Sequence, residues 1–575
     1  MLFDEVNSYR RIFLKGATGS ALAFGLNGCS ITKNNNTPIE QCRNEISPFI
    51  AGDFPVKADP KQKMYFDAHT HFFNARDVPV AEFLAKSLGH TLPNEIRVLV
   101  EALAPIVEAL SSSLAPSCQD EMFTLCSRSN VSAQSGAQKN IALDDEIVMH
   151  REKIATLLTD ELLKNIVIQD FIRRRFNDGF KMHGYTDTNE FNKDFVFEAL
   201  NNGSTNWPAK YSRRKLTKLD IQNINKNEFA ILNFAGLLRF AGLMLSPRHH
   251  NLRSFIKDYA DANPDTPMSG CFGALVDFKY WLNSSQQVSA MRDQVILHEQ
   301  LAILSNGFLM PLVAYNPWVD IKEDDASLKT VVWAIQEHGC VGVKIYPSMG
   351  FYPYGNKELG HLENSTEKRP PLGELDKKLK VLYETCRSLG VPVMAHANES
   401  MGRDDSHDKL SGPIGWSKAN ELVTLNGLNV NAGHFGGDGS GKTDNLSEEF
   451  ARLIDESKNL KIYADLGYWD KLPTDEKVQI RLKNVIKRHP LISERLMYGS
   501  DWHMISKEPL WAQYPSDVFK VLLGIDESGN LANRVFGQNI LDCFGLSNKP
   551  ANLTARSRLR KMYSNRRTTI PAWLI

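Results

Sequence analysis

The sequence has no excess of charge of either sign. Its 575 residues hold 67 Lys and Arg against 67 Asp and Glu, a formal net charge of zero. Proteins that bind nucleic acid non-specifically carry a basic surface, so this balance argues against that class. With 42% hydrophobic and 23% charged residues, the chain has the composition of a globular protein, large enough for one big domain with insertions or for several smaller ones.

Cysteine is also scarce, and no two cysteines stand in a CxxC pattern. A cysteine-based zinc or redox site is therefore not expected. Cys340, Cys386 and Cys543 lie among apolar neighbours and are predicted to be buried thiols. Cys118 and Cys126, in a polar, Ser-rich stretch, are the better candidates for a disulfide.

The N-terminal segment lacks an apolar run long enough to span a bilayer. Paired Arg10 and Arg11 precede a short, Gly-rich apolar stretch that ends in LNGC at residues 26–29. RRIFLK resembles a twin-arginine export signal, and LNGC resembles a bacterial lipobox in which Cys29 is lipidated. Asn27 is uncommon in that box, so cleavage elsewhere stays open. We expect export in a bacterium to the periplasm or cell surface, with a lipid anchor in the membrane.

Residues 30–63, polar with several prolines, are predicted to be a linker. Residues 80–265 carry apolar side chains at helical spacing, with a Ser-rich break at 111–138 and no repeat of fixed period. Residues 547–575 form a basic tail with seven Lys or Arg and no acid. It is expected to be solvated, and its charges could rest on anionic lipid head groups.

Short apolar segments alternate with amphipathic helices after about residue 270. With residues 64–69, the candidate strands are 273–278, 308–315, 341–347, 391–396, 428–434, 460–466 and 495–501. The helix at 374–389 ends at Gly390, a typical C′ residue, just before a strand. This alternation predicts a parallel (β/α)8 TIM barrel over residues 64–546. Residues 80–265 then form a long helical insertion after strand 1, on the face where the loops of such barrels build active sites.

Histidine is sparse, with 15 in the chain, yet His69 and His71 stand two apart at the end of the first strand. Residues i and i+2 of a strand face the same side, so the two imidazoles can converge on a metal ion. An isolated pair is equally compatible with histidines that bind no ion. His396, His434 and Asp501, however, end three later predicted strands, and this order favours one metal site.

The segments FDAHTHFFN, VMAHANES, NAGHFGG and YGSDWH resemble the amidohydrolase superfamily, in its branch of metal-dependent hydrolases related to aminocarboxymuconate-semialdehyde decarboxylase. NRVFGQNILDCFGL, with Gly537 and Asn539, resembles the C-terminal helix of that branch. The resemblance covers residues 64–80 and 270–546. It implies a divalent ion, zinc first, whose ligands are His69, His71, His396 and Asp501.

The resemblance also implies catalytic roles. Asp501 would take the proton of a metal-activated water and hand it to the leaving group. His434 would orient the water, stabilise an oxyanion or bind a second metal. Lys344 leaves the number of ions open: carbamylated, it would bridge two metals with His434 and His396, whereas its ammonium could instead bind a substrate carboxylate or an acid. One ion is favoured.

Several neighbours of these residues are weaker candidates. Substrate binding is considered for Asn74, Arg76 and Trp502, with capping of the first loop as the alternative for Asn74, Arg76 and Asp77. Asp465 and Trp469, at the end of strand 7, are also considered as residues that line the site. His503 stands where the family pattern has proline. His249 and His250 are expected in a solvated turn.

The predicted function is hydrolysis of an amide, ester or lactone bond of a small molecule by a metal-activated water. One alternative is a metal-dependent decarboxylase. Another is a non-catalytic surface lipoprotein that retains the barrel. The sequence identifies neither the substrate, the metal, a protein partner nor the oligomeric state.

Overall fold

The computed structural model describes residues 63–88, 94–134, 142–181, 191–201, 226–263, 266–282, 288–363, 369–439, 446–549 and 553–575. The predicted export signal, Cys29 and the linker up to residue 62 lie outside the described residues.

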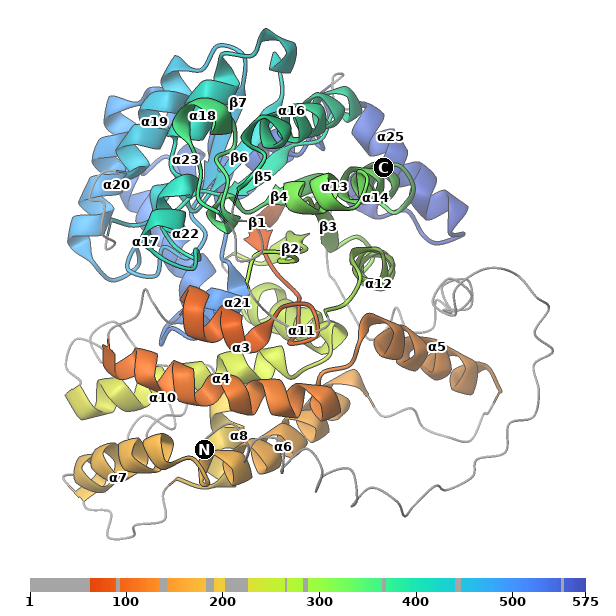
Figure 1. Ribbon diagram of the computed structural model, residues 1–575. Helices are drawn as coiled ribbons and strands as arrows, with labels where there is room; N and C mark the ends of the chain where they lie inside the picture. Colours follow the sequence, from red (N-terminus) through yellow and green to blue (C-terminus); the bar gives the residue numbers. More distant parts are fainter. Residues whose placement is uncertain are drawn as a thin grey trace. The chain divides into compact units, whose positions relative to one another are not determined.

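Eight parallel strands form one sheet in sequence order. They are β1 (Tyr65–Thr70), β2 (Met268–Ala274), β3 (Leu309–Ala314), β4 (Gly342–Ile345), β5 (Val393–His396), β6 (Asn429–Gly433), β7 (Lys461–Asp465) and β8 (Leu496–Met497). Backbone hydrogen bonds join the region of β8 to β1, from Ala68 N–H to the Tyr498 carbonyl (2.9 Å) and from Asp501 N–H to the His69 carbonyl (2.7 Å). The predicted (β/α)8 barrel is therefore confirmed (Figure 1).

The helices that follow the strands surround the sheet (Figure 1). They include α12 (Met291–Leu304), α14 (Ala326–Glu337), α16 (Leu372–Leu389), α19 (Leu446–Glu456), α20 (Glu476–Arg488) and α22 (Tyr514–Ile525). Helix α16 ends as predicted: Gly390 has φ +64°, and the Val391 N–H donates to the Cys386 carbonyl (3.0 Å). This left-handed cap turns the chain directly into β5.

Strand β2 lies earlier than predicted, at Met268–Ala274 instead of 273–278. A Cβ at Gly270 would lie 3.0 Å from the Phe308 carbonyl, so the strands approach closely where the sequence is small and Gly-rich. The more apolar residues 275–278 leave the sheet, and Phe278 reaches a cavity at the mouth of the barrel. Hydrophobicity alone placed the strand four to five residues too late.

The insertion after β1 is helical. Its elements are α3 (Val80–Glu82), η2 (Phe83–Leu88), α4 (Asn94–Leu114), α5 (Cys118–Gln134), α6 (Leu143–Leu162), α7 (Ile166–Lys181), α8 (Lys193–Asn201), α10 (Lys226–Met244), α11 (Arg248–Phe255) and η4 (Ile256–Asp261). The expected Ser-rich break is largely helix instead. Ser111, Ser112 and Ser113 return their hydroxyls to carbonyls three residues earlier, which keeps these side chains compatible with α4. By length and composition Asn94–Cys126 could cross a membrane, a test that buried helices of globular proteins also pass.

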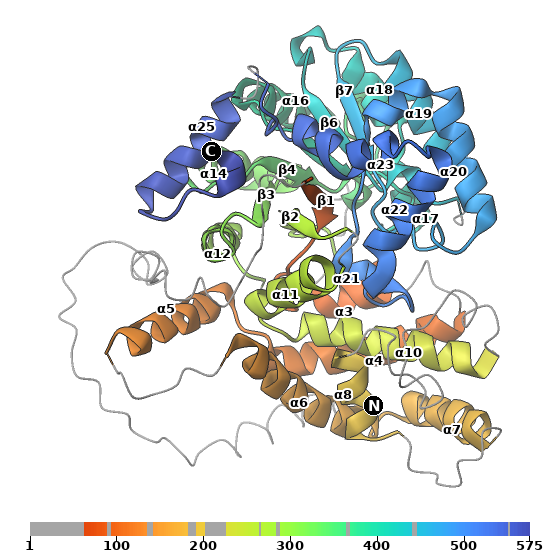
Figure 2. The same ribbon diagram turned by 180° about the vertical axis from the view of Figure 1, so that it is seen from behind.

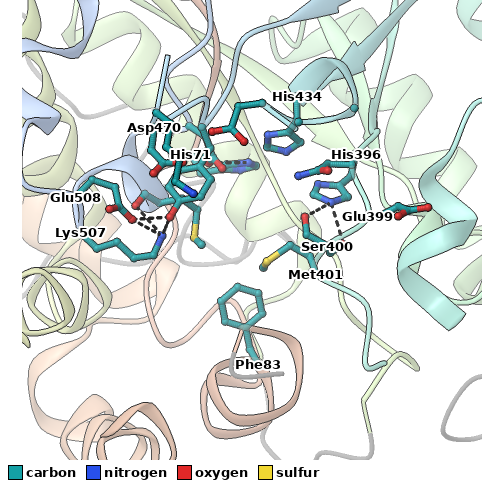
Figure 3. Close-up of a pocket in the computed structure, with 18 of the residues that line it drawn as sticks. His71, Phe83, His396, Glu399, Ser400, Met401, His434, Asp470, Lys507 and Glu508 are labelled. Carbon is teal, nitrogen blue, oxygen red and sulfur yellow. Dashed lines mark hydrogen bonds and ion pairs between the residues drawn. The ribbon is translucent and has the colours of Figure 1, made fainter. Parts of the chain in front are cut away.

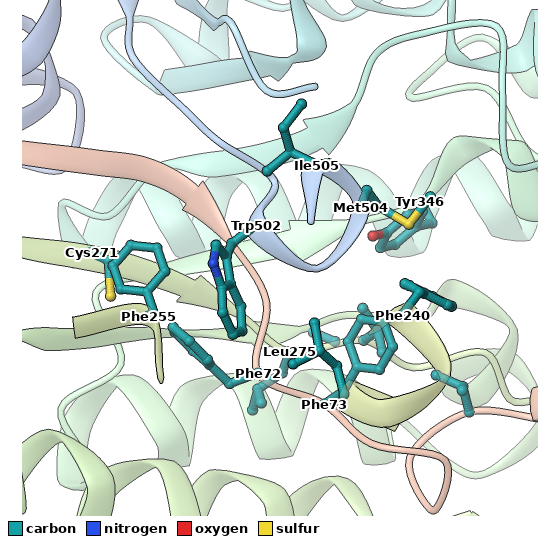
Figure 4. Packing of buried hydrophobic residues seen from close by; sticks show 14 of the residues in the cluster. Phe72, Phe73, Phe240, Phe255, Cys271, Leu275, Tyr346, Trp502, Met504 and Ile505 are labelled. Atoms are coloured by element: carbon teal, nitrogen blue, oxygen red, sulfur yellow. The ribbon is translucent and has the colours of Figure 1, made fainter. Parts of the chain in front are cut away.

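Helix α10 attaches the insertion to the barrel. Arg239 donates to the Ser506 carbonyl (2.8 Å), next to α21 (Trp502–Ile505). A Cβ at Gly236 would lie 1.9 Å from the Lys507 carbonyl oxygen, so only glycine allows this approach. Phe72, Phe255 and Trp502 pack together where β1, α11 and α21 meet (Figure 4). Figure 2 shows α4, α6, α7, α8 and α10 grouped beside the barrel.

The basic tail is not the solvated segment that was expected. Residues Leu553–Asn565 form α25, whose Leu559, Met562 and Tyr563 are buried with barrel-interior residues such as Phe272. Several of the positive charges have structural partners: Arg556 donates to the Leu546 carbonyl (2.8 Å) and Arg566 to Glu299 (2.7 Å). An amphipathic helix, with the apolar residues spread among the basic ones, conceals this role in the sequence.

Of the two candidates for a disulfide, Cys126 is disulfide-bonded, as predicted. For Cys118 the prediction is wrong, because Cys118 is a buried free thiol. Cys340, Cys386 and Cys543 are buried free thiols, as predicted.

Candidate active site

The end of β1 is irregular at the predicted metal-binding pair. The pairing of β1 with β2 shifts between Asp67 and Thr70, and Asp67 Oδ1 accepts from the N–H groups of His69 (3.0 Å) and Ser500 (3.0 Å). A bulge of this kind redirects side chains. Asp67 is fully buried, and desolvation raises its pKa to about 7. It fixes the backbone that presents His69.

Asp465, at the end of β7, orients His69. Its Oδ1 lies 3.0 Å from His69 Nδ1 and accepts from the backbone N–H groups of His434 (3.0 Å) and Gly467 (2.9 Å). Asn431 donates to its other oxygen (2.8 Å). With Nδ1–H donated to this carboxylate, Nε2 of His69 is the nitrogen open to a ligand, the usual arrangement around a metal-binding histidine. This assignment of the tautomer follows from the hydrogen bonds.

His71 and Asp501 complete a group with His69. One ligand atom from each lies within 4.8 Å of the others, and all three residues are buried. His71 Nδ1 donates to the Ala274 carbonyl (2.7 Å), which directs Nε2 to Asp501 Oδ1 at 3.9 Å. Asp501 Oδ1 has no hydrogen-bond partner in the described part of the chain. Two imidazoles and an unpartnered buried carboxylate are the donor set that a divalent transition-metal ion requires, so these residues fit the implied ion.

Burial shapes the protonation of this group. Desolvation lowers the pKa of His69 and His71 well below the ordinary value, with the charge of Lys344 adding to the effect. Both rings are therefore neutral and able to coordinate. Desolvation raises the pKa of Asp501 to about 7, against the lowering effect of the lysine charges. A carboxyl group in this range can both accept and release a proton near neutral pH.

Lys344 on β4 lies inside the group. Its Nζ is 3.1 Å from His69 Nε2 and 4.9 Å from the centre of the Tyr346 ring. The side chain is fully buried, and desolvation lowers its pKa to about 8, although Asp465 and Asp501 favour the charged form. An amine with this pKa is partly neutral at physiological pH, which is the form that carbamylation or metal binding needs.

His434 and His396 lie next to this group. Their ring centres are 4.6 Å apart, and the His434 ring is also 4.6 Å from that of His69. His434 Nδ1 donates to the Gly467 carbonyl (2.9 Å), and desolvation lowers its pKa to about 4. The ring is thus neutral with an acceptor Nε2. His396 lies beside the group, but its Nε2 is 3.0 Å from the Ser400 carbonyl and 3.1 Å from the Ser400 hydroxyl.

Backbone strain marks the same positions. His434, Phe435 and Asp501 have φ of +71°, +45° and +51°, in the left-handed region that non-glycine residues seldom adopt. Such strain concentrates where a site fixes a side chain in an unusual direction. Trp469 supports the strained segment by donating from its indole N–H to the His434 carbonyl (2.7 Å).

A cavity of about 460 Å³ opens over these residues (Figure 3). His71, His396, His434 and Asp501 line it. The insertion and the β1 loop contribute an apolar wall of Phe73, Phe83, Ile96, Phe229 and Leu237. Later loops contribute a polar wall of Glu399, Asp438, Asp470, Lys471, Lys507 and Glu508. The volume suits a small organic molecule.

Three residues considered for substrate binding lie elsewhere. Asn74 is fully buried and donates to the carbonyls of Pro116 (3.1 Å) and Ser246 (3.3 Å). It also caps the first loop, accepting from the Arg76 N–H (2.9 Å). Trp502 is a core residue. None of the three is among the residues that line this cavity, and the hydrogen bonds of Asn74 favour the capping alternative for that residue.

His503, which replaces the expected proline, also has a structural role. Its Nδ1 lies 2.6 Å from the His71 carbonyl and its Nε2 3.0 Å from the Phe73 carbonyl. The ring stacks on Phe73 at 4.8 Å. It therefore holds the β1 loop against α21.

Asp67, Tyr346, Ser400 and the polar wall were not identified from the sequence as site residues. Asp67 had a recognisable position, two residues before His69 on the same strand. Lys507 and Glu508 come after α21 in a segment without a motif, and only folding brings them to the cavity.

Comparison with known proteins gives little further guidance. No family model matches the chain, and no curated protein matches it. One similar solved structure is a probable 2-pyrone-4,6-dicarboxylic acid hydrolase from Acinetobacter baumannii with citric acid bound, at 14% identity and a TM-score of 0.32. The match covers 51% of this chain and 88% of that one. At this TM-score the likeness supports no functional conclusion, and the barrel is established by its own strand order.

Proposed function

We propose that this protein is a metal-dependent hydrolase of the amidohydrolase type, which cleaves an amide, ester or lactone bond of a small molecule. The observation that carries the proposal is the buried convergence of His69, His71 and Asp501 at the C-terminal end of the barrel, facing a cavity. A divalent ion held there, zinc first, supplies Lewis acidity that makes water acidic near neutral pH and polarises a carbonyl oxygen.

Asp501 is the proposed general base. Its buried, unpartnered Oδ1 accepts a proton from the attacking water and returns it to the leaving group. Desolvation raises its pKa to about 7 in the absence of an ion, and a bound cation would lower that pKa toward the ionised form that a base requires. His434 orients the water or a substrate hydroxyl through Nε2, which is an acceptor because Nδ1–H is donated to Gly467. A neutral ring of this tautomer cannot donate from Nε2, which argues against the oxyanion-stabilising role considered from the sequence.

The two walls of the cavity favour an amphipathic substrate. Phe83, Ile96 and Phe229 would cover an apolar part, and Lys507 and Glu508 would face a polar part. The insertion supplies most of the apolar wall, so it selects the substrate while the barrel performs the chemistry.

A decarboxylase remains the second candidate because of Lys344. The buried Lys344 side chain does not line the cavity, but its positive charge beside His69 and Asp501 would stabilise a substrate carboxylate held at the metal ligands. Product analysis separates the two reactions: a hydrolase incorporates solvent oxygen into its product, whereas a decarboxylase releases carbon dioxide.

Metal analysis of the full chain, purified without chelator, tests the proposal. The parent protein is expected to hold about one more equivalent of transition metal than the variants His71→Ala and Asp501→Ala. His489→Ala, a surface control whose ring pairs with Glu448 and Asp455, should keep the parent content. Equal metal content in all four proteins would refute the site. Metal that is bound without turnover of esters, lactones, amides or carboxylic acids would favour the non-catalytic lipoprotein.

Export and lipid anchoring are proposed from the N-terminal motifs alone. Expression of the full chain in a bacterium with labelled palmitate should label the parent and not Cys29→Ala. An unlabelled parent that is found outside the cytoplasm would favour cleavage elsewhere.

A further inference from the structure

His249 and His250 are not in the solvated turn that was expected. They lie near the start of α11 and are 2% and 3% exposed. Pro247 stands at the N-cap, where its fixed φ suits the start of a helix, so the PRHH segment opens a helix instead of a turn. Helix α11 packs against α6 (Figure 2), and the two rings face Glu146 of α6.

The nitrogens of these rings converge on one carboxylate oxygen. Glu146 Oε1 lies 3.3 Å from His250 Nε2 and 3.9 Å from His249 Nε2. The three ligand atoms all lie within 4.8 Å of one another. A tetrahedral zinc-like ion, about 2.0–2.2 Å from each ligand, sets ligand atoms roughly 3.3–3.6 Å apart. The two distances to Glu146 Oε1, 3.3 and 3.9 Å, lie in this range or within a few tenths of an ångström of it, and the distance between the two imidazole nitrogens is at most 4.8 Å.

A second carboxylate fixes the direction of His249. Glu121 of α5 is fully buried, and its Oε1 lies 2.8 Å from His249 Nδ1 and accepts from the His249 backbone N–H (2.8 Å). Arg248 donates to its other oxygen (2.9 Å). With Nδ1–H held in this way, Nε2 of His249 points to Glu146, and it has no hydrogen-bond partner within the described ranges. A carboxylate behind a histidine is the outer shell typical of metal ligands.

The cluster is also accessible and able to coordinate. The Glu146 side chain is 32% exposed, which gives an ion a way in and leaves room for a water as fourth ligand. His250 reaches Glu146 through Nε2, and its buried Nδ1 has no hydrogen-bond partner within the described residues. At His249 Nε2 a divalent cation would occupy the position that faces Glu146.

We propose that Glu146, His249 and His250 bind a divalent transition-metal ion, zinc first, at a site in the helical insertion that is separate from the one at the barrel mouth. The ion joins α6 to α11. Because Arg248 of the same helix binds Asp77 in the loop after β1, the ion also braces the insertion against the barrel. Its role is structural, since none of its ligands lines the cavity.

Zinc titration of the full chain tests this proposal. After chelation and dialysis against Zn²⁺, Glu146→Gln and His250→Ala should each hold about one equivalent less than the parent. Glu152→Gln, an exposed position on the same helix, is the matched control and should equal the parent. The loss should add to that of His71→Ala, so failure at one site is distinguishable from failure at the other. Equal zinc content in Glu146→Gln, His250→Ala and the control would show an ion-pair network only and overturn the proposal.

A diffraction measurement keeps the test independent of variant folding. In crystals of the parent protein soaked in Zn²⁺, an anomalous difference peak is expected between the Glu146 carboxylate and the two imidazoles. Zinc at the barrel mouth without a peak at this position would overturn the proposal.

Discussion

Arg248 is a buried cation that joins α11 of the insertion to the loop after β1, and its replacement by methionine is expected to destabilise the chain by about 3–5 kcal/mol. Its side chain is fully buried. It donates to both oxygens of Asp77 (2.5 and 2.8 Å), to Glu121 (2.9 Å) and to the Pro116 carbonyl (3.1 Å). It therefore connects the β1 loop with α5 and α11.

The magnitude depends on the groups that methionine leaves behind. Methionine fills a similar length but removes the charge, so Asp77 and Glu121 remain as buried carboxylates without their shared partner. Breaking one buried ion pair costs about 3–5 kcal/mol because the remaining charge is uncompensated. Two carboxylates place the cost near the upper end of that range. The triple variant Arg248→Met, Asp77→Asn, Glu121→Gln removes those charges and should regain part of the loss.

Urea unfolding at pH 7, followed by tryptophan fluorescence, measures the effect. Arg253→Met, on the same helix, is the control: its partners Asp144 and Asp261 have side chains 40% and 42% exposed, so its loss should stay at about 1 kcal/mol or less. If Arg248→Met costs no more than this control, or if the triple variant is less stable than the single one, the reasoning about uncompensated buried charge is wrong.

Three further predictions concern other parts of the chain. In thermal unfolding, Gly236→Ala should destabilise the protein by about 1–3 kcal/mol, because its Cβ would clash with the Lys507 carbonyl. Gly524→Ala is the control: a Cβ there has nothing within 4 Å, so this variant should be stabilised by about 0.5–1 kcal/mol. Met562→Ala should cost about 2–5 kcal/mol in urea unfolding, since it removes α25 contacts from the barrel core; a loss below about 0.5 kcal/mol would mean that the tail is dispensable. Desolvation and Glu508 raise the pKa of Asp470 from 3.8 to about 8, so the folded state holds a proton that the unfolded state releases, and stability falls as pH rises through that window. Asp470→Asn should therefore gain stability over the parent between pH 5 and pH 9, and an equal difference at both pH values would contradict the shift.

The candidate metal ligands could be predicted from the sequence because their positions follow from strand order. In a parallel barrel every strand ends at the same face, so His69, His396, His434 and Asp501 at successive strand ends had to lie near one another. The detailed orientation of these side chains could not be predicted from the sequence. The bulge at Asp67 and the turn of His396 toward Ser400 depend on hydrogen bonds that no strand pattern encodes.

For the insertion and the tail, sequence patterns did not predict which residues are buried. Helical periodicity identified the helices but not their partners, so His249 and His250 were expected in solvent when they are buried against α6. In the tail, seven basic residues obscured the apolar face of α25. A high density of charged residues indicates exposure only where no neighbouring carbonyl or carboxylate accepts hydrogen bonds from the charged side chains.

The sequence by itself determined the barrel, the place of the insertion and the residue types at the strand ends, because strand–helix alternation and ligand order are local patterns carried along the chain. The tertiary structure decided which of those side chains share a site, which nitrogens are free, and which cations and carboxylates are buried together. These depend on contacts between residues far apart in the chain, such as Lys344 with His69 and Arg248 with Asp77. Desolvation in such contacts sets the pKa of Asp501 and Lys344, and no local pattern in the chain encodes it.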